Sequence, residues 1–398
     1  MLTFFEELGV IKNFVRHMAR KGSTHNLSVA LVAGLLAERL GLEPKRLYLG
    51  GLLHDVGGIG IFENLIAEPL FHEEFFEKDS EFWLHPEVSY KIVNEFLGLD
   101  IPEIKEHHEL FNGKGYPAKR GYDEVSVGGY VIGISDKFEI LSKNWEYNFQ
   151  DILRTIKSWR GKMYPSFIID EFIDLFREEK RLLYDIRHPS CLELRLKDLE
   201  RRLDFSDVRL KKDNLFRFFS IAVALKHPYT GEHSERVSLL VKKVGESIGL
   251  DDESLNVLVA SAYYHDIGKV VIPRGVLDKP TVLTPSEARI MKEHSLKTYE
   301  ILNISDHTRD LAFIASCHHE AVDGSGYPLG LSGEDIPLMS RIINIVDIYD
   351  ALTSLRSYRD AYSKKEALDI MEKEFKGKID LGLFETFKKI LKEMEYEL

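Results

Sequence analysis

The chain repeats itself at an interval of about 210 residues, and this repeat limits its fold more than any other feature of the sequence. Four segments of the first half recur in the same order in the second half. They are THNLSVA (24–30) with EHSERVS (232–238), LLHDVGG (52–58) with YYHDIGK (263–269), HHELFNGKGYP (107–117) with HHEAVDGSGYP (318–328), and VIGISDKFEIL (131–141) with IINIVDIYDAL (342–352). The offset is 208 residues for the first pair and 211 for the other three. A nearly constant offset indicates two copies of one domain.

The apolar residues inside each copy follow helical spacing. Steps of three and four place one face of a helix toward the core, as in His233, Val237, Leu240 or Val241, Val244 and Ile248, and in His25, Val29, Val32, Leu36 and Leu40. The run from Thr284 to Glu287 is a capping box that begins a helix carrying His294. With no series of alternating strands, the sequence predicts an all-α fold. We expect two tandem helical bundles, 1–180 and 221–398, joined by a helical connector, 181–220.

Two further helices are predicted outside the repeats. The connector carries a heptad-like stripe of leucines, namely Leu192, Leu196, Leu199 and Leu203. This stripe favours a connector helix that packs on its own chain, and the alternative is a homodimer seam. A second apolar stripe lies near the N-terminus, at Phe4, Leu8, Ile11, Val15 and Met18. It predicts an amphipathic helix packed on the first domain, and the alternative is a membrane-surface anchor.

Composition excludes several classes of protein. The 398 residues carry 53 Lys+Arg against 65 Asp+Glu, a net charge of −12, which disfavours binding to DNA or RNA polymers. The longest smooth apolar stretch, 27–37, is too short to span a bilayer of roughly 30 Å. Only Cys191 and Cys317 are present, so a disulfide scaffold is excluded and a reducing compartment, the cytoplasm, is expected.

A recurring set of histidines and aspartates is the strongest functional signal. Imidazole and carboxylate groups are the usual donors to first-row transition metals. The second copy contributes His233, His265, Asp266, His294, His318, His319 and Asp347, and the first copy contributes His25, His54, Asp55, His85, His107, His108 and Asp136. Because both copies keep nearly the same spacing, we interpret these residues as metal ligands rather than as structural histidines.

The donor set favours two ions in each copy. Adjacent residues on a helix diverge by roughly 100°, so His265-Asp266 and His318-His319 suit two centres, with Asp266 as a bridge. Two divalent ions and two aspartates leave a positive charge that attracts an anion, and paired ions are known in phosphoester hydrolysis. The donors by themselves suit iron, manganese, nickel or zinc. Cys317 adjoins His318, where it is either a thiolate ligand or, as we favour, a buried thiol.

Residues 220–372 resemble an HD-GYP domain, a group within the HD metal-dependent phosphohydrolases. The resemblance rests on the HD pair His265-Asp266, on the GYP motif at 326–328, and on the flanking segments HPYTGEHSERV, HDIGKVVIP and RIINIVDIYDALTSLRSYR. It implies an all-α fold, a dinuclear iron or manganese site and hydrolysis of cyclic di-GMP to linear pGpG or GMP. The seven donors of the second copy match the metal positions of that family.

The resemblance also implies roles for residues around the metals. Asp266 bridges the ions, and Lys269 resembles a phosphate contact or proton donor, which suits a cation beside a leaving oxygen. Tyr327 shapes the pocket, and Arg356 and Arg359 match a basic pair that holds phosphate or guanine. Arg341 belongs either to the site or to a structural ion pair. Relatives with a third metal carry a Glu where this chain has Tyr229 and Lys21, so we expect two ions per site.

The first copy keeps its metal donors and GYP but differs around them. The residues that answer Lys269, Arg341, Asp350, Arg356 and Arg359 are Gly58, Tyr130, Glu139, Trp145 and Asn148. We expect a metal-binding domain with weak cyclic di-GMP activity that regulates or docks on the second domain. The alternatives are a site for a different phosphorylated substrate and a second phosphodiesterase site. For the whole protein, the alternatives are an HD-type hydrolase of another nucleotide and a non-catalytic sensor of cyclic dinucleotides.

Overall fold

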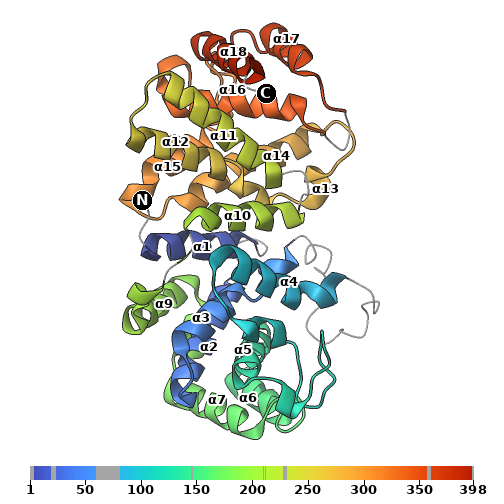
Figure 1. Ribbon diagram of the computed structural model, residues 1–398. Coiled ribbons are helices and arrows are strands. Elements are labelled where there is room, and N and C mark those ends of the chain that lie inside the picture. Colours follow the sequence, from blue (N-terminus) through green and yellow to red (C-terminus); the bar gives the residue numbers. More distant parts are fainter. Residues whose placement is uncertain are drawn as a thin grey trace. The chain divides into compact units, whose positions relative to one another are not determined.

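The computed structural model describes residues 4–18, 24–59, 81–144, 147–208, 210, 212–226, 231–355 and 360–396. These residues form helices joined by turns, and no β-strand occurs among them (Figure 1). The extended pairings in the described part are isolated bridges at Asn112 with Gly121, Arg160 with Tyr164, and Asp323 with Ser332. The prediction of an all-α fold is confirmed.

Contacts divide the chain into two compact units, and each unit holds one copy of the repeat. One unit is Phe14–Phe218, and the other joins Met1–Asn13 to Phe219–Leu398. Below, these are called the N-terminal unit and the C-terminal unit. Since this division is one of contacts, the domain limits expected from the sequence stay predictions.

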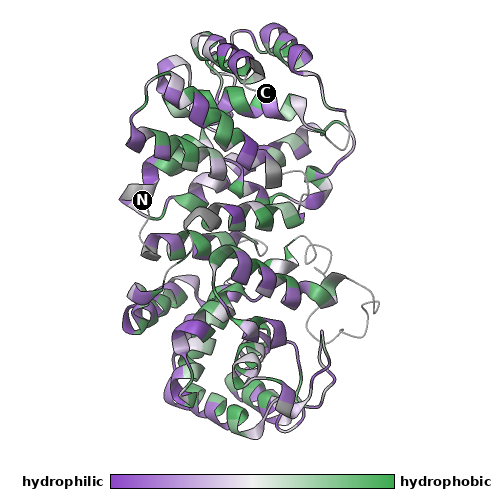
Figure 2. Ribbon diagram, in the orientation of Figure 1, coloured by the Kyte–Doolittle hydropathy of each residue, from purple (hydrophilic) through white to green (hydrophobic). Residues whose placement is uncertain are grey.

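The N-terminal unit is built around a helix that is buried on almost every side. This helix, α2 (His25–Leu40), is apolar from Leu27 to Ala37, which explains its central position. Figure 2 shows this apolar character in the ribbon. Packed directly or indirectly around it are α3 (Pro44–Leu53), α4 (His85–Ile92), α5 (Val127–Lys143), α6 (Phe149–Ser158), α7 (Ser166–Glu178), α8 (Leu182–Arg187) and α9 (Pro189–Leu203).

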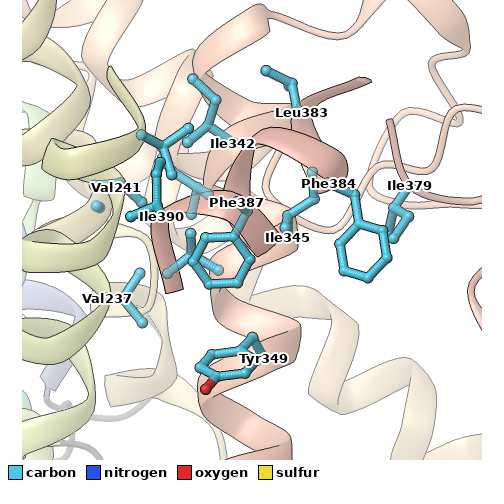
Figure 3. Close-up of a cluster of buried hydrophobic side chains, with 14 of the residues drawn as sticks. Val237, Val241, Ile342, Ile345, Tyr349, Ile379, Leu383, Phe384, Phe387 and Ile390 are labelled. Carbon is cyan, nitrogen blue, oxygen red and sulfur yellow. The ribbon is translucent and has the colours of Figure 1, made fainter. Parts of the chain in front are cut away.

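The C-terminal unit repeats this plan. Its elements are the end of α10 (Lys212–Lys226), then α11 (Gly231–Ser247), α12 (Asp252–Tyr264), η10 (Ile267–Val271), α13 (Arg274–Leu277), α14 (Pro285–Leu302), α15 (Asp306–Ser316), α16 (Leu338–Thr353), α17 (Lys364–Glu374) and α18 (Leu381–Tyr396). Figure 3 shows part of its core, where Val237 and Val241 of α11 meet Ile342 and Ile345 of α16 and Phe387 of α18. This core fixes α11 against α16, the two helices that carry the first and last predicted ligands.

The capping box predicted before His294 is present. The Thr284 hydroxyl accepts the Glu287 backbone N–H at 3.3 Å, and the Glu287 carboxylate accepts the Thr284 N–H at 2.7 Å. Pro285 occupies the first turn of α14, as predicted. The reciprocal cap satisfies two of the free N–H groups at the start of the ligand helix.

The leucine stripe of the connector packs inside the N-terminal unit. Its four leucines lie on α9 and are at most 7% exposed: Leu192, Leu196, Leu199 and Leu203. Leu199 lies beside Gly34 of α2, and the hydroxyl of Tyr48 donates a hydrogen bond to Glu200. The interpretation that the connector packs on its own chain is confirmed. The alternative, a homodimer seam through these leucines, is wrong because their side chains are already buried.

Helix α1 (Phe4–Met18) was expected to pack on the first domain, and this is wrong for its first ten residues. Asn13 donates its side-chain amide to the carbonyl oxygens of Glu300 and Ile301, at 3.2 and 3.3 Å, and Ser305 donates to Glu6 at 2.8 Å. These polar contacts place the segment with the C-terminal unit. The apolar face of the helix is buried in the protein, at Leu8, Ile11, Phe14 and Val15. These side chains are therefore not exposed for contact with a membrane, as the alternative of a membrane-surface anchor requires.

Candidate metal centre

The HD pair of each copy lies at the end of a helix, where backbone carbonyl groups lack intrahelical partners. His265 follows α12 and donates its Nδ1–H to the carbonyl of Ala262, at 2.6 Å. His54 follows α3 and bonds Gly51 in the same way, at 2.8 Å. A proton fixed on Nδ1 leaves the lone pair on Nε2, which points into the cluster. Local helix geometry therefore sets the ligating tautomer.

Two more imidazoles in each copy are held by the same contact to a carbonyl three residues earlier. In the C-terminal unit these are His294, bonded to Met291 at 2.7 Å, and His318, bonded to Ala315 at 2.7 Å. Their Nε2 atoms then face each other at 3.4 Å. Burial lowers the pKa of His294 to about 4 and holds that of His318 well below its usual value. Two facing lone pairs without a proton between them suit a bound cation.

The N-terminal unit repeats this pair. His85 donates to the carbonyl of Phe82 at 2.7 Å, His107 donates to that of Ile104 at 2.6 Å, and the two Nε2 atoms are 3.3 Å apart. Burial lowers the pKa of both rings. The same cation-ready arrangement is therefore present in both copies.

A carboxylate orients the first histidine of each cluster. Asp350 accepts the Nδ1–H of His233 at 2.7 Å and is itself held by Arg236 through two bonds, at 2.7 and 3.0 Å. Burial alone would raise the pKa of Asp350, but His233 and Arg236 lower it to about 2. The carboxylate is therefore ionised and keeps the Nε2 atom of His233 turned toward the other ligands.

Glu139 performs this task in the N-terminal unit. It accepts from the Nδ1 of His25 at 2.7 Å and is paired with Lys143 at 2.6 Å. The sequence comparison counted Glu139, in place of Asp350, among the differences of the first copy, but the structure shows that the orienting role is kept. The available signal was an acidic residue three positions after the last ligand in both copies.

The aspartate of each HD pair presents one oxygen to each half of its cluster. In the C-terminal unit, Oδ2 of Asp266 lies 3.3 Å from His265 and 3.7 Å from His233, while Oδ1 lies 3.5 Å from His294 and 3.9 Å from His318. Oδ1 is buried and has no hydrogen-bond partner among the described residues. An orphaned carboxylate oxygen between two imidazoles is what a bridging ligand would show without its ions.

Asp55 has nearly the same geometry. Its Oδ2 lies 3.3 Å from both His25 and His54, and its Oδ1 lies 3.4 Å from His85 and 3.9 Å from His107. Two clusters built on separate units thus agree to within 0.4 Å in all four of these distances.

All fourteen predicted donors are brought together. Within each group the donor atoms lie within 4.8 Å of one another. The groups are His25, His54 and Asp136; Asp55, His85, His107 and His108; His233, His265 and Asp347; His294, His318 and His319; and His265, Asp266 and His318. These clusters can bind metal, and nitrogen and oxygen donors of this kind fit divalent transition ions.

The electrostatics of the C-terminal cluster also suit ligation. Burial would raise the pKa of Asp266 and Asp347, but nearby cationic groups hold both well below the usual value. Burial would lower the pKa of His233, but Asp347 and Asp350 raise it to about 9. Burial lowers the pKa of His319 to about 3. Most donors are therefore already in the deprotonated form that a metal requires.

The GYP loop supports the second histidine of the adjacent pair. Tyr327 donates its backbone N–H to the carbonyl of His319 at 3.1 Å, and the two rings lie 4.8 Å apart at 33°. A side chain at Gly326 would place its Cβ 2.3 Å from the nitrogen of Ala321, so only glycine fits. The motif thus packs tightly on the ligand rather than standing apart from it. In the N-terminal unit Tyr116 stacks on His108 at 4.5 Å and 25°.

A buried glutamate that the sequence analysis did not single out organises the same loop. Glu320 accepts backbone N–H groups from Leu329 and Leu331, at 2.6 and 2.9 Å. Glu109 accepts from Ala118 and Arg120, at 2.7 and 2.9 Å. The signal available in the sequence was the shared HHE triplet, whose third residue lies 1–2% exposed in both units.

The remaining predicted residues fall into four groups. Lys269 donates a hydrogen bond to Oδ2 of Asp266, so its ammonium lies at the bridge. Arg341 forms an ion pair with Asp380 at 2.8 Å, which is the structural alternative, and its contact with substrate stays a prediction. Cys317 is fully buried and outside the ligand groups, and burial raises the pKa of its thiol to about 11, as expected for a structural thiol. Five residues lie outside the described ones, namely Lys21, Trp145, Tyr229, Arg356 and Arg359.

Comparison with known proteins agrees with this architecture. Two family models described as HD domains match the chain, one at residues 22–141 and the other at 217–383. The chain therefore belongs to the HD-domain family, as a tandem HD protein of the HD-GYP type. A crystal structure of a cyclic GMP-AMP specific phosphodiesterase of Vibrio cholerae shares the fold, with a TM-score of 0.65 and 22% identity over 97% of both chains.

Three curated relatives are similar to parts of the chain. A 3′3′-cGAMP-specific phosphodiesterase 3 of Vibrio cholerae is 30% identical over 75% of this chain. The response regulator RpfG of Xanthomonas campestris, a cyclic di-GMP phosphodiesterase, is 38% identical over 47% of it. A cyclic di-GMP phosphodiesterase of Thermotoga maritima is 38% identical over 42%. The chain spans 64%, 50% and 45% of the lengths of these relatives.

Among the described residues, no helix is long and apolar enough to cross a membrane.

Proposed function

We propose that the C-terminal unit hydrolyses a 3′3′-linked cyclic dinucleotide, with cyclic di-GMP as the first candidate, to linear pGpG and/or GMP. The observation that carries this proposal is the position of Asp266. Its two buried oxygens face the two halves of a His/Asp cluster, and Lys269 contacts the same carboxylate. A paired-metal site with an adjacent cation is an arrangement suited to cleaving a phosphodiester.

His233, His265 and Asp347 would hold one ion and His294, His318 and His319 the other, with Asp266 between them. We propose iron or manganese, with nickel or zinc as alternatives. When bound, such ions lower the pKa of water and neutralise negative charge on phosphorus-bound oxygens.

The side chains around the ligands would contact the substrate and shape the site. Lys269 is 18% exposed and close to the cluster, so its ammonium can contact a phosphate oxygen or give a proton to the leaving oxygen. Tyr327, whose ring lies tilted against that of His319, forms a wall beside the ligands. His319 and Asp347 are half-buried, so the cluster reaches the protein surface.

The second candidate substrate is 3′3′-cGAMP. It is favoured by the Vibrio cholerae relative named for that substrate, because the match extends over 75% of this chain and so reaches into both HD domains. The residues that contact the bases decide between guanine and adenine, and Arg356 and Arg359, proposed to hold phosphate or guanine, lie outside the described residues.

The test is an anaerobic assay of the full chain loaded with Fe(II) or Mn(II), with metal quantification and product analysis. Cyclic di-GMP and 3′3′-cGAMP are supplied separately. We expect hydrolysis of at least one, and a loss of about 10²- to 10⁴-fold in Lys269→Met with its metal content kept. Tight binding of both nucleotides without turnover by the loaded protein would contradict the proposal and favour a sensor.

A further inference from the structure

Lys269 lies on a short helix whose own hydrogen bonds hold it weakly. This helix, η10, is a 3-10 helix of five residues that begins directly after Asp266. The hydrogen bonds of a 3-10 helix have poorer geometry than those of an α-helix, so the position of a short one depends on its surroundings. The contacts that hold η10 therefore also determine where the ammonium of Lys269 lies beside Asp266.

Two side chains from other helices bind the backbone on either side of Lys269. The hydroxyl of Thr298, on α14, accepts the N–H of Gly268 at 3.1 Å. Lys226, the last residue of α10, donates its ammonium to the carbonyl of Val270 at 2.7 Å. Lys226 is 3% exposed and Val270 is 1% exposed, so water does not compete for this hydrogen bond. The residues directly before and after Lys269 are thus both held.

A small cavity shows that α10 also lies close to the HD pair. Its lining includes Phe219, Ser220 and Val223 of α10 together with Asp266 and Ile267. The second half of α10, the bridging aspartate and the start of η10 therefore belong to one packed region of the C-terminal unit. The hydrogen bond at the end of η10 fixes the other end of that short helix to the same neighbour.

The contact at the start of η10 is common to both copies. In the N-terminal unit the hydroxyl of Ser89 accepts the N–H of Gly57 at 2.9 Å. These two residues correspond to Thr298 and Gly268. Thr298 also donates its hydroxyl to the carbonyl of His265 at 2.9 Å. The shared contact therefore supports the HD pair itself, which both copies have.

The contact at the end of η10 involves a lysine that the first copy lacks. Helix α1 corresponds to α10, because each has 15 residues and ends seven positions before the first predicted ligand of its copy. Its last residue is Met18, which has no hydrogen-bond donor in its side chain, in place of Lys226. Gly58 likewise stands in place of Lys269. The two lysines are therefore present together in one copy and absent together from the other.

We propose that Lys226 is a positioning residue for Lys269. Through the carbonyl of Val270 it holds η10, so that the ammonium of Lys269 stays beside Asp266, where it can meet a phosphodiester. This inference rests on the function proposed for the C-terminal unit. A displacement of about 1 Å at a reacting group can cost about 10²-fold in rate, so loss of this one hydrogen bond should slow hydrolysis without removing any metal ligand.

The first test needs no activity. Hydrogen exchange of the metal-free, full-length protein is measured by mass spectrometry in Lys226→Met, which introduces the residue that the first copy has at this place. We expect the backbone amides of η10 to exchange about tenfold faster or more, because their helix has lost a contact at one end, and those of α16 to exchange as in the wild type. Lys243→Met, which removes an exposed lysine of α11, is the matched control and should change nothing.

Two exchange results would overturn the proposal. One is unchanged exchange in η10. The other is faster exchange throughout the C-terminal unit, which would make Lys226 a residue of general stability rather than one that holds η10. Should Lys226→Met not fold, Lys226→Gln, whose donor reaches less far than that of lysine, replaces it with the same expectations.

The second test is kinetic and uses the Mn(II)-loaded protein. Lys226→Met should lower kcat for cyclic dinucleotide hydrolysis about 10- to 100-fold, with KM and metal content kept. Lys226→Arg retains a donor and should restore most of the rate. In a Lys269→Met background, Lys226→Met should cost less than about threefold, because it acts through a lysine that is no longer there. Equal losses in both backgrounds would contradict the proposal.

The two tests separate this inference from the proposed function. If the loaded wild-type protein hydrolyses no cyclic dinucleotide, the proposed function fails, and the exchange of η10 still decides whether Lys226 holds this helix. If hydrolysis occurs but Lys226→Met leaves both kcat and the exchange of η10 unchanged, the proposed function stands and the positioning role is wrong.

Discussion

The two copies agree in their metal donors and differ in the groups around them. The oxygens of Asp55 and Asp266 lie at nearly the same distances from their four histidines. By contrast, Lys269 of η10, which contacts Asp266, is replaced by Gly58 in the N-terminal unit. Ligand geometry is set by contacts within a few residues, whereas the outer charges come from positions that can change independently.

The orienting ion pairs show the same freedom. Asp350 is neutralised by Arg236 of another helix, but Glu139 is neutralised by Lys143 one turn further along its own helix. Ser28 occupies the place of Arg236 in the first copy. The longer glutamate and a cation at i+4 achieve what the aspartate and a distant arginine achieve. An aligned comparison of the two copies therefore shows two changed residues, the carboxylate and its cation, although the first histidine is still oriented by an ion pair.

Packing against the adjacent histidines is also solved in two ways. Asn344 of α16 donates its amide to the carbonyl of His318, at 2.8 Å. Its counterpart, Gly133 of α5, lies so close to the carbonyl of His107 that an added Cβ would be 2.2 Å from that oxygen. Helix α16 therefore contacts this backbone segment through a side-chain amide, whereas α5 packs directly against it because Gly133 has no side chain.

The largest expected effect would break the proposed division of labour. Asp266→Ala removes the bridging donor of the C-terminal cluster and should reduce cyclic dinucleotide hydrolysis by more than about 10³-fold, because it removes both prospective ions. Asp55→Ala should cost the N-terminal unit its ions while hydrolysis is retained. The measurement is the rate together with the metal content of each variant. Loss of turnover in Asp55→Ala with C-terminal metal intact would show that the division is wrong.

An intermediate effect would test the equivalence of the orienting carboxylates. Asp350→Asn and Glu139→Gln should each weaken metal binding about 10- to 100-fold in their own unit, because the first histidine loses its fixed tautomer. Competition with a chelator gives the affinity of each unit. As a control, Glu372→Gln removes an exposed carboxylate distant in sequence from both clusters and should have no effect. A strong effect in one unit alone would show that the two pairs are not equivalent.

The smallest expected difference concerns pH. Burial would lower the pKa of His25, but Glu139 and Asp55 raise it to about 10, against about 9 for His233. A metal must displace these protons, so below those values each fall of one pH unit should weaken binding by up to tenfold. Metal affinity should therefore rise with pH and level off near pH 9 in Asp55→Ala and near pH 10 in Asp266→Ala. A flat profile, or plateaus in the reverse order, would contradict this.

Much of the fold and the site could be predicted because the relevant contacts are local. Three imidazoles of each copy are held by a carbonyl three residues earlier, as at His265, His294 and His318, so the residues that orient them lie within one turn. The cap at Thr284 likewise depends on residues within one turn. Helical periodicity predicted the all-α class for the same reason.

The sequence by itself therefore determined the duplication, the helical class and the fourteen histidines and aspartates that gather in the clusters. Only the tertiary structure decided which unit holds the first ten residues of α1, that Arg341 pairs with Asp380, and that Glu139 takes the orienting role of Asp350. Each of these depends on segments far apart in the chain or on a charge that moved to another helix. Spacing along the sequence records local geometry, and it does not record which distant side chains share a site.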